Sequence, residues 1–141
     1  MNGTDLTALI DTMDEDRVEL LLQLFAEVDL TISTPPRTGL MMLAVHDSFA
    51  TAFYPGEILV TEARVIYDGC EGFGMVLGEA PRRALARAAS DAVFRHPEVT
   101  QIMKSVRACL VEEATLQKTK QLENAALVAA TKVNFDLMPG A

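Results

Sequence analysis

The sequence lacks tryptophan and contains only two histidines and two cysteines among its 141 residues. Two isolated thiols, Cys70 and Cys109, form neither a disulfide framework nor a metal-ligand cluster. We interpret both as ordinary small apolar residues, with a redox or ligand role as the alternative. No two histidines stand four residues apart, the spacing at which a helix binds a metal. The chain is therefore short of the residues that most often carry catalysis.

Positive charge and long apolar runs are also scarce. With 12 basic and 20 acidic residues, the formal charge of −8 repels polyanions, so we expect no nucleic-acid partner. No run approaches the roughly 20 apolar residues that cross a bilayer, and the acidic segment 1–16 has no feature of a secretory signal. We expect a cytoplasmic protein. Half of the residues are apolar, which is enough for one domain over 1–141.

Turn-forming residues divide the middle of the chain into short segments. Polar and apolar residues alternate over 29–33, and Thr34-Pro35-Pro36-Arg37 is expected to end that strand because proline has no donor N–H. We expect Pro55-Gly56 and Asp68-Gly69 to be turns. The remaining strand segments are 39–45, 50–54, 57–67 and 73–77. Four or five short strands without an intervening helix predict an antiparallel meander.

Amphipathic helices are predicted on both sides of this meander. Helical spacing over 6–25 predicts two short helices or one bent helix, and a second stripe over 85–93 follows a start signal at Pro81. A third stripe begins at Val99 and loses phase after residue 110, so we expect two C-terminal helices with a break near 108–113. Because helices and strands are segregated along the chain, the predicted class is α+β.

The two histidines are weak candidates for a catalytic site. In His46-Asp47-Ser48, neighbouring side chains on a strand point to opposite faces, so the three cannot form one triad locally. Strand-end and turn residues are the simpler interpretation. His96 precedes Pro97 at a helix end, where a structural or exposed histidine is expected. We predict no catalytic residue and no metal site in this chain.

A glycine-containing stretch leads into the arginine-rich helix. Residues 72–78 have the wrong spacing for a dinucleotide fingerprint, and we interpret Gly72 and Gly74 as permitting a turn and a close approach to the sheet. Unpaired N–H groups at the helix start, with Arg83 and Arg87 nearby, would attract an anion. The alternative function is therefore a small phosphate- or nucleotide-binding module. Surface ion pairs are the simpler interpretation of these arginines.

The final segment, 122–138, is apolar on nearly every side if it is helical. Such a helix must be buried, and a small domain cannot easily surround it. Either it crosses the meander as part of the core, or it binds an obligate partner. In the second case the candidate interface residues at its end are Lys132, Val133 and Phe135.

Several motifs, in this order and spacing, resemble the G subunit of the bacterial carbon–phosphorus lyase core complex, the PhnG family. They are Thr38-Gly39-Leu40, Phe53-x-x-Gly56-Glu57 before Val60-Thr61, the glycine stretch 72–78 with its arginine helix, and AATKVNF at 129–135. The resemblance spans most of the chain. It departs from the family pattern at Glu62, at Glu79, from Arg83 to Leu85 and in the tail, so a family site that used these positions is altered here, as it would be in a paralogue.

The resemblance implies a cytoplasmic hetero-oligomer that acts in phosphonate catabolism and contains H, I and J subunits. With the H, I and L proteins, the family member supports displacement of adenine from MgATP by a phosphonate, which gives a ribose 1-phosphonate 5-triphosphate. The J subunit later cleaves the carbon–phosphorus bond by radical chemistry. The implied role of this chain is that of a non-catalytic subunit of the ribosyl-triphosphate transferase. MgATP is then a co-substrate of the complex, and this chain binds no cofactor itself.

Overall fold

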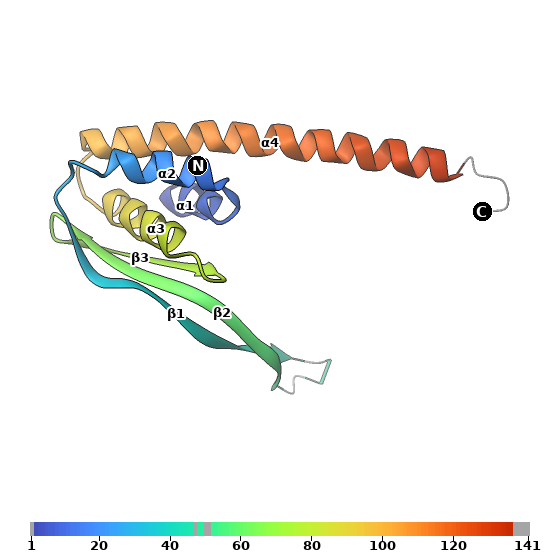
Figure 1. Cartoon of the computed structure of the whole chain (residues 1–141), viewed down its shortest axis with the longest axis horizontal. Helices are drawn as coiled ribbons and strands as arrows, with labels where there is room; N and C mark the ends of the chain where they lie inside the picture. The colour runs from blue at the N-terminus through green and yellow to red at the C-terminus, as the bar shows by residue number, and fades with distance from the viewer. Residues whose placement is uncertain (1, 47, 50–51, 137–141) are drawn as a thin grey trace.

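A computed structural model describes residues 2–46, 48–49 and 52–136 of the chain. It places the helices on one side of an antiparallel sheet, as Figure 1 shows. The elements are α1 (Gly3–Ala8), the 3-10 turn η1 (Leu9–Thr12), α2 (Glu15–Leu24), β1 (Leu30–His46), β2 (Ala52–Tyr67), β3 (Cys70–Leu77), α3 (Pro81–Phe94) and α4 (Gln101–Asp136). This order confirms the predicted α+β class.

Two short helices open the chain, as one of the two alternatives for 6–25 predicted. The side chain of Asn2 caps α1 by accepting a hydrogen bond of 2.8 Å from the N–H of Asp5. The extended backbone at Met13 and Asp14 then separates η1 from α2. Leu6 of α1 and Val18 and Leu21 of α2 are buried in the core, together with Ile10 of η1 and Met13 of the connection.

The sheet has three long strands in the described residues, so the prediction of four or five short strands is wrong. All neighbours are antiparallel, in the order β1-β2-β3. Strand β1 runs through Pro35 and Pro36, with shifts of register on either side of Thr34. An edge strand tolerates prolines at such bulges because it has a partner on one side only. Gly56 pairs with Leu43 inside the β1–β2 ladder, so the predicted turn at Pro55-Gly56 is also wrong.

Helix α3 packs against the sheet at unusually short range. A Cβ atom on Gly72 would lie 2.2 Å from the carbonyl oxygen of Ala88, and one on Gly74 would lie 2.3 Å from that of Ala84. Only glycine fits at these two positions, because any side chain would collide with the helix backbone. The expected close approach at the two glycines is confirmed.

Two side chains of α3 bind the backbone at the free edge of β3. The N–H of Phe73 donates to the carboxylate of Asp91 at 3.0 Å. The guanidinium of Arg87 donates to the carbonyl oxygen of Met75 at 3.2 Å. These contacts satisfy backbone groups that would otherwise be available to another strand.

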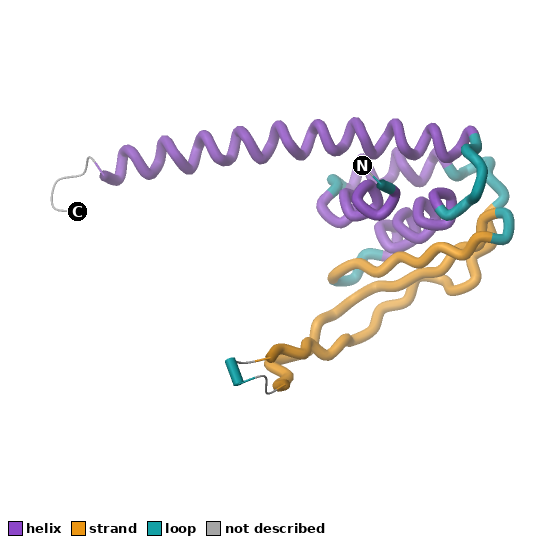
Figure 2. Tube along the Cα trace, turned by 180° about the vertical axis from the view of Figure 1, so that it is seen from behind, coloured by secondary structure: helices purple, strands orange, loops and turns teal. Residues whose placement is uncertain are grey.

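Helix α4 is one continuous helix from Gln101 to Asp136, so the predicted break near 108–113 is wrong. The apolar stripe changes there because the surroundings change, not because the backbone turns. Met103, Val106 and Leu110 are buried against the other helices, whereas the next buried position is the charged Glu113. In Figures 1 and 2, α4 lies over the helical layer on the side away from the sheet, and its second half extends well past the rest of the molecule. It does not cross the meander as core.

Candidate partner-binding site

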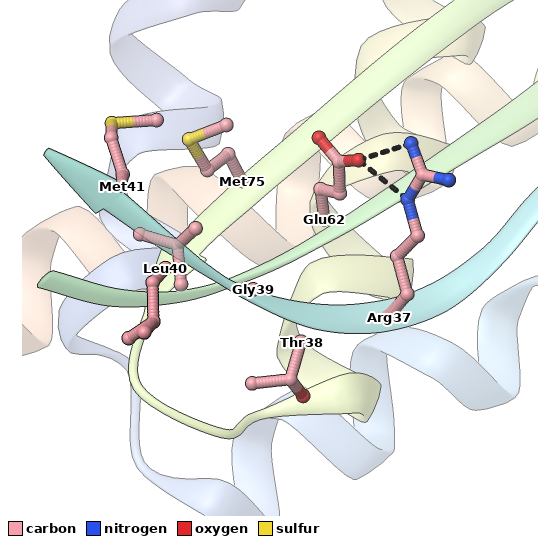
Figure 3. Close-up of a pocket in the computed structure, with 8 residues that line it drawn as sticks. Arg37, Thr38, Gly39, Leu40, Met41, Glu62 and Met75 are labelled. Carbon is pink, nitrogen blue, oxygen red and sulfur yellow. Dashed lines mark hydrogen bonds and ion pairs between the residues drawn. The ribbon is translucent and has the colours of Figure 1, made fainter.

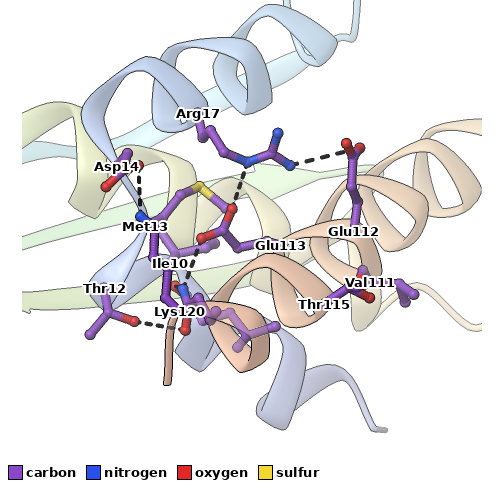
Figure 4. Close-up of polar contacts among 12 residues, drawn as sticks. Ile10, Thr12, Met13, Asp14, Arg17, Val111, Glu112, Glu113, Thr115 and Lys120 are labelled. Carbon is purple, nitrogen blue, oxygen red and sulfur yellow. Dashed lines mark hydrogen bonds and ion pairs between the residues drawn. The ribbon is translucent and has the colours of Figure 1, made fainter. Parts of the chain in front are cut away.

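A buried polar cluster fixes the first half of α4 to the N-terminal helices (Figure 4). The Nε of Arg17 in α2 lies 2.5 Å from Oε2 of Glu113, which is 3% exposed. Gln117 donates to the other oxygen of Glu113 at 2.9 Å and to the carbonyl of Leu9 at 3.1 Å. Thr12 donates to the side-chain oxygen of Gln117 at 3.0 Å. The ion pair and hydrogen bonds of Glu113 and Gln117 therefore hold α4 in place up to residue 117.

Beyond that cluster, α4 leaves the rest of the molecule. Lys120 pairs with Asp14 at 3.0 Å, but both side chains are more than half exposed, so this pair adds little. Every described side chain from residue 121 to 131 is exposed. The large apolar ones are Leu122, Leu127 and Val128, at 64%, 66% and 67% exposure. We name residues 118–131 the helical arm. An apolar helix exposed on all sides is the mark of a surface that a partner covers.

The interface residues predicted from the sequence lie at the far end of this helix. The backbone at Lys132, Val133 and Phe135 belongs to α4, while their side chains fall outside the part of the chain that the structure describes. Their role at an interface stays a prediction. Within the helical arm, the exposed large apolar side chains that are described begin ten residues earlier, at Leu122.

A second exposed apolar region, which was not predicted from the sequence, lies on the distal part of the β1–β2 hairpin. We name residues 39–46 and 52–59 the hairpin arm. Leu40, Met42 and Leu59 are 65%, 59% and 42% exposed. The available signal was the run Gly39 to Met42, in which apolar residues do not alternate with polar ones as they would in a half-solvated strand.

At the base of the hairpin arm, the sheet forms a shallow hollow of about 230 Å³ (Figure 3). Met41 and Met75 point to the same side of the sheet, and Glu62 binds Arg37 beside them at 2.6 Å. Methionine side chains adapt to irregular surfaces, which suits a contact with another protein. The lining residues are Arg37, Thr38, Gly39, Leu40, Met41, Val60, Glu62 and Met75.

Arg83 and Arg87, the candidates for anion binding, form ion pairs with the N-terminal segments, which is the simpler interpretation that the sequence offered for them. Arg83 donates to the carbonyl oxygens of Ile10 and Met13 at 2.5 and 2.7 Å and pairs with Glu15 at 2.6 Å. Arg87 pairs with Asp11 at 2.5 Å. These contacts tie α3 to η1 and to the start of α2. Anion binding at Arg83 and Arg87 stays a prediction, and an anion there would compete with two carboxylates of the chain.

His96 forms a clasp between the end of α3 and the β2–β3 turn. Its Nε2 lies 2.7 Å from the carboxylate of Asp68, and its ring lies 5.6 Å from that of Tyr67. The hydrogen bond to Asp68, followed by the one to the carbonyl of Glu98, raises the pKa of His96. His46 is exposed on the hairpin arm, and Asp47 beside it lies outside the described residues. The geometry of His96 is that of a structural histidine.

The two cysteines are half-buried free thiols. Burial raises the pKa of the Cys109 thiol, which disfavours the reactive thiolate. Within the residues that the structure describes, no three His, Cys, Asp or Glu side chains gather as metal ligands. No helix in that same part of the chain is long and apolar enough to span a membrane.

The fold and the exposed surfaces thus define a small α+β protein with an anchored helical layer and two projecting apolar arms. The chain belongs to the PhnG family: the family model described as "Phosphonate metabolism protein PhnG" matches residues 4–140. Its role accordingly lies in phosphonate metabolism. A search of curated proteins gave no match.

Proposed function

We propose that this chain is a non-catalytic subunit of the carbon–phosphorus lyase system of phosphonate catabolism. In this role it joins the H, I and J subunits in a cytoplasmic complex. The complex, with the L protein, transfers ribose 5-triphosphate from MgATP to a phosphonate and displaces adenine. The chain would supply binding surface to this complex and leave the chemistry to its partners.

The observation that carries the proposal is the helical arm. Leu122, Leu127 and Val128 together expose apolar surface on a helix that the rest of the chain does not cover. Burying a leucine-sized side chain is worth about 1.5–3 kcal/mol, so covering the arm would yield several kcal/mol of binding free energy. Membership of the PhnG family supplies the metabolic setting in which such a partner would be found.

The test is co-expression of the chain with the H, I and J subunits of a carbon–phosphorus lyase system. We expect a complex that survives purification, and we expect the double variant Leu127→Glu/Val128→Glu to be lost from it, because two charges would have to be buried. The matched control is Val99→Glu, since Val99 is 71% exposed but lies in the α3–α4 connection, away from the helical arm.

A wild-type chain that stays apart from all three subunits would overturn the proposal. Retention of the arm variant in the complex at the wild-type level would show that the helical arm is not the interface. The circular dichroism spectrum of the free variant should match that of the wild type, because both substituted positions are exposed.

A further inference from the structure

We propose that the helical arm and the hairpin arm contact one and the same partner subunit and hold it between them. This inference rests on the proposed function and goes beyond it, because it assigns a role to the hairpin arm and states that the two arms bind a single subunit. The partner is inferred to be one folded protein, different from this chain, with an apolar surface that carries neutral or basic groups.

The two arms extend in the same direction. In Figure 1 both arms extend from the helical layer and the sheet toward the same side of the molecule, and the reverse view in Figure 2 shows the same arrangement. The two arms come from opposite layers, one above the helices and the other from the sheet. A partner that binds the face of one arm turned toward the other arm therefore lies in the space between the two arms.

Exposed apolar surface leads from the hairpin arm toward the helical layer. A second hollow, of about 440 Å³, lies where the base of the hairpin arm meets η1 of the helical layer. Met41 and Ile58 line it from the hairpin, Leu77 from the end of β3, and Asp11 and Thr12 from η1. Leu77 is 74% exposed although it ends a strand of the central sheet. Exposed apolar surface therefore continues inward from the hairpin arm to the layer that anchors α4.

Each arm alone is smaller than the interface that a stable complex needs. Specific interfaces usually take about 20–30 residues from each partner. The helical arm spans residues 118–131, and about half of the residues on any helix can face one partner at a time. Residues of the hairpin arm likewise alternate between two faces. Neither arm alone reaches the usual size, whereas the two arms together with the hollow at Met41, Ile58 and Leu77 approach it.

The negative charge of the chain disfavours a second copy of it as the occupant. Residues 1–117 contain nine Lys and Arg against 18 Asp and Glu, a formal net charge of −9. Two copies that held each other between their arms would bring two strongly acidic bodies together, and like charges at close range oppose association. The helical arm itself carries Lys118 and Lys120 against Glu123. A partner with a neutral or basic surface beside its apolar patch fits this distribution.

The test is site-directed photo-crosslinking in the assembled complex of this chain with the H, I and J subunits. A benzoylphenylalanine replaces Leu127 on the helical arm in one protein and Met42 on the hairpin arm in another, and Val99 serves as the control position. We expect positions 127 and 42 to crosslink to the same subunit and position 99 to give no such product. Both substitutions are at exposed sites, so the chain should still fold.

Affinity measurements on the same complex add a quantitative readout. We expect Leu127→Glu and Met42→Glu each to weaken binding of the shared partner by about tenfold or more, as at interface positions that carry binding energy. For two separated contacts to one body, the effects in the double variant multiply to about a hundredfold. Val99→Glu should leave the affinity unchanged.

The outcomes separate this inference from the proposed function. Crosslinks from the two arms to different subunits, or a Met42→Glu variant with wild-type affinity for the subunit that Leu127 contacts, would overturn the shared partner and leave the proposed function standing. A crosslink to a second copy of the chain would overturn the identity of the occupant. Failure of the wild-type complex to form would overturn both.

Discussion

Arg17 and Glu113 form an ion pair in which the carboxylate side chain is 4% exposed and the guanidinium side chain 20% exposed. Helix α4 is held to α2 at this point, shortly before it leaves the rest of the molecule. A buried pair contributes little net stability compared with apolar packing, but it is costly to break on one side. This asymmetry makes the pair a sensitive probe of how α4 is anchored.

The first prediction is that Glu113→Ala destabilises the fold by about 3 kcal/mol, because it leaves the Arg17 cation without its buried partner. Urea unfolding followed by circular dichroism measures this free energy. Glu112→Ala is the matched control: Glu112 is 67% exposed and lies 3.8 Å from the same arginine, so its loss should cost less than about 1 kcal/mol. Equal costs for the two variants would contradict the structure.

The second prediction concerns the close approach of α3 to the sheet. Gly74→Ala places a methyl group 2.3 Å from the carbonyl oxygen of Ala84, so the helix must move away from β3 and the free energy of unfolding should fall by about 3 kcal/mol. Thermal and urea unfolding measure the loss. Gly39→Ala, where no atom lies within 4 Å of the added Cβ, should change the stability by less than about 1 kcal/mol. A Gly74→Ala protein as stable as the wild type would show that the helix and sheet are not in contact here.

The third prediction concerns the dynamics of α4 in the isolated chain. A helix of fewer than about 15 residues without tertiary contacts is marginal in water. Amide hydrogens of residues 121–131 should therefore exchange with solvent much faster than those of residues 103–113, where Val106 and Leu110 are buried. Hydrogen exchange followed by mass spectrometry measures both segments in one experiment. In the assembled complex the helical arm should become protected, and uniform protection along α4 of the free chain would contradict its exposure.

The fourth prediction is a pH dependence at the His96–Asp68 clasp. The pKa of His96 is raised above its ordinary value of about 6.5, so the clasp stabilises the fold fully below that pH. The stabilisation is lost as the pH rises through the folded-state pKa. We expect Asp68→Asn to lower the pKa of His96 in an NMR titration and to destabilise the protein more at about pH 5.5 than at about pH 9. In a His96→Gln background, the effect of Asp68→Asn should no longer depend on pH.

Local signals in the sequence predicted the helices before residue 100 well, since spacing alone distinguishes Val18, Leu21 and Phe25 as one buried face, but they did not predict that α4 is continuous. They also predicted the close approach at Gly72 and Gly74. They failed at Pro35-Pro36 and Pro55-Gly56, where local chemistry favours turns. In both cases the long β1–β2 pairing overrides that preference. This pairing joins residues that are distant in the sequence, so local signals cannot predict it.

The site was predictable in part. The apolar character of the segment after Leu122 indicated a partner-binding surface, and the structure shows this segment exposed over its described length. The ion-pair partners of Arg83 and Arg87 could not be predicted from the sequence, because Glu15 and Asp11 lie at sequence separations of 68 and 76 from them. Ion pairs between residues so far apart produce no spacing pattern in a single sequence.

The two edges of the sheet are unequal, and this limits what the strands can build. The edge of β3 is occupied by Asp91 and Arg87, whereas β1 carries its exposed apolar residues Leu40 and Met42 on the other edge. Head-to-tail stacking of sheets into a fibre requires that β1 of one molecule reach β3 of the next. The contacts of Asp91 and Arg87 oppose strand addition at β3, and the strand edges left open are that of β1 and that of β2 before Val60, where β3 does not pair with it. A partner that covers the hairpin arm would also shield the open edges over 39–46 and 52–59, so the unassembled chain is the form at risk of strand-to-strand association.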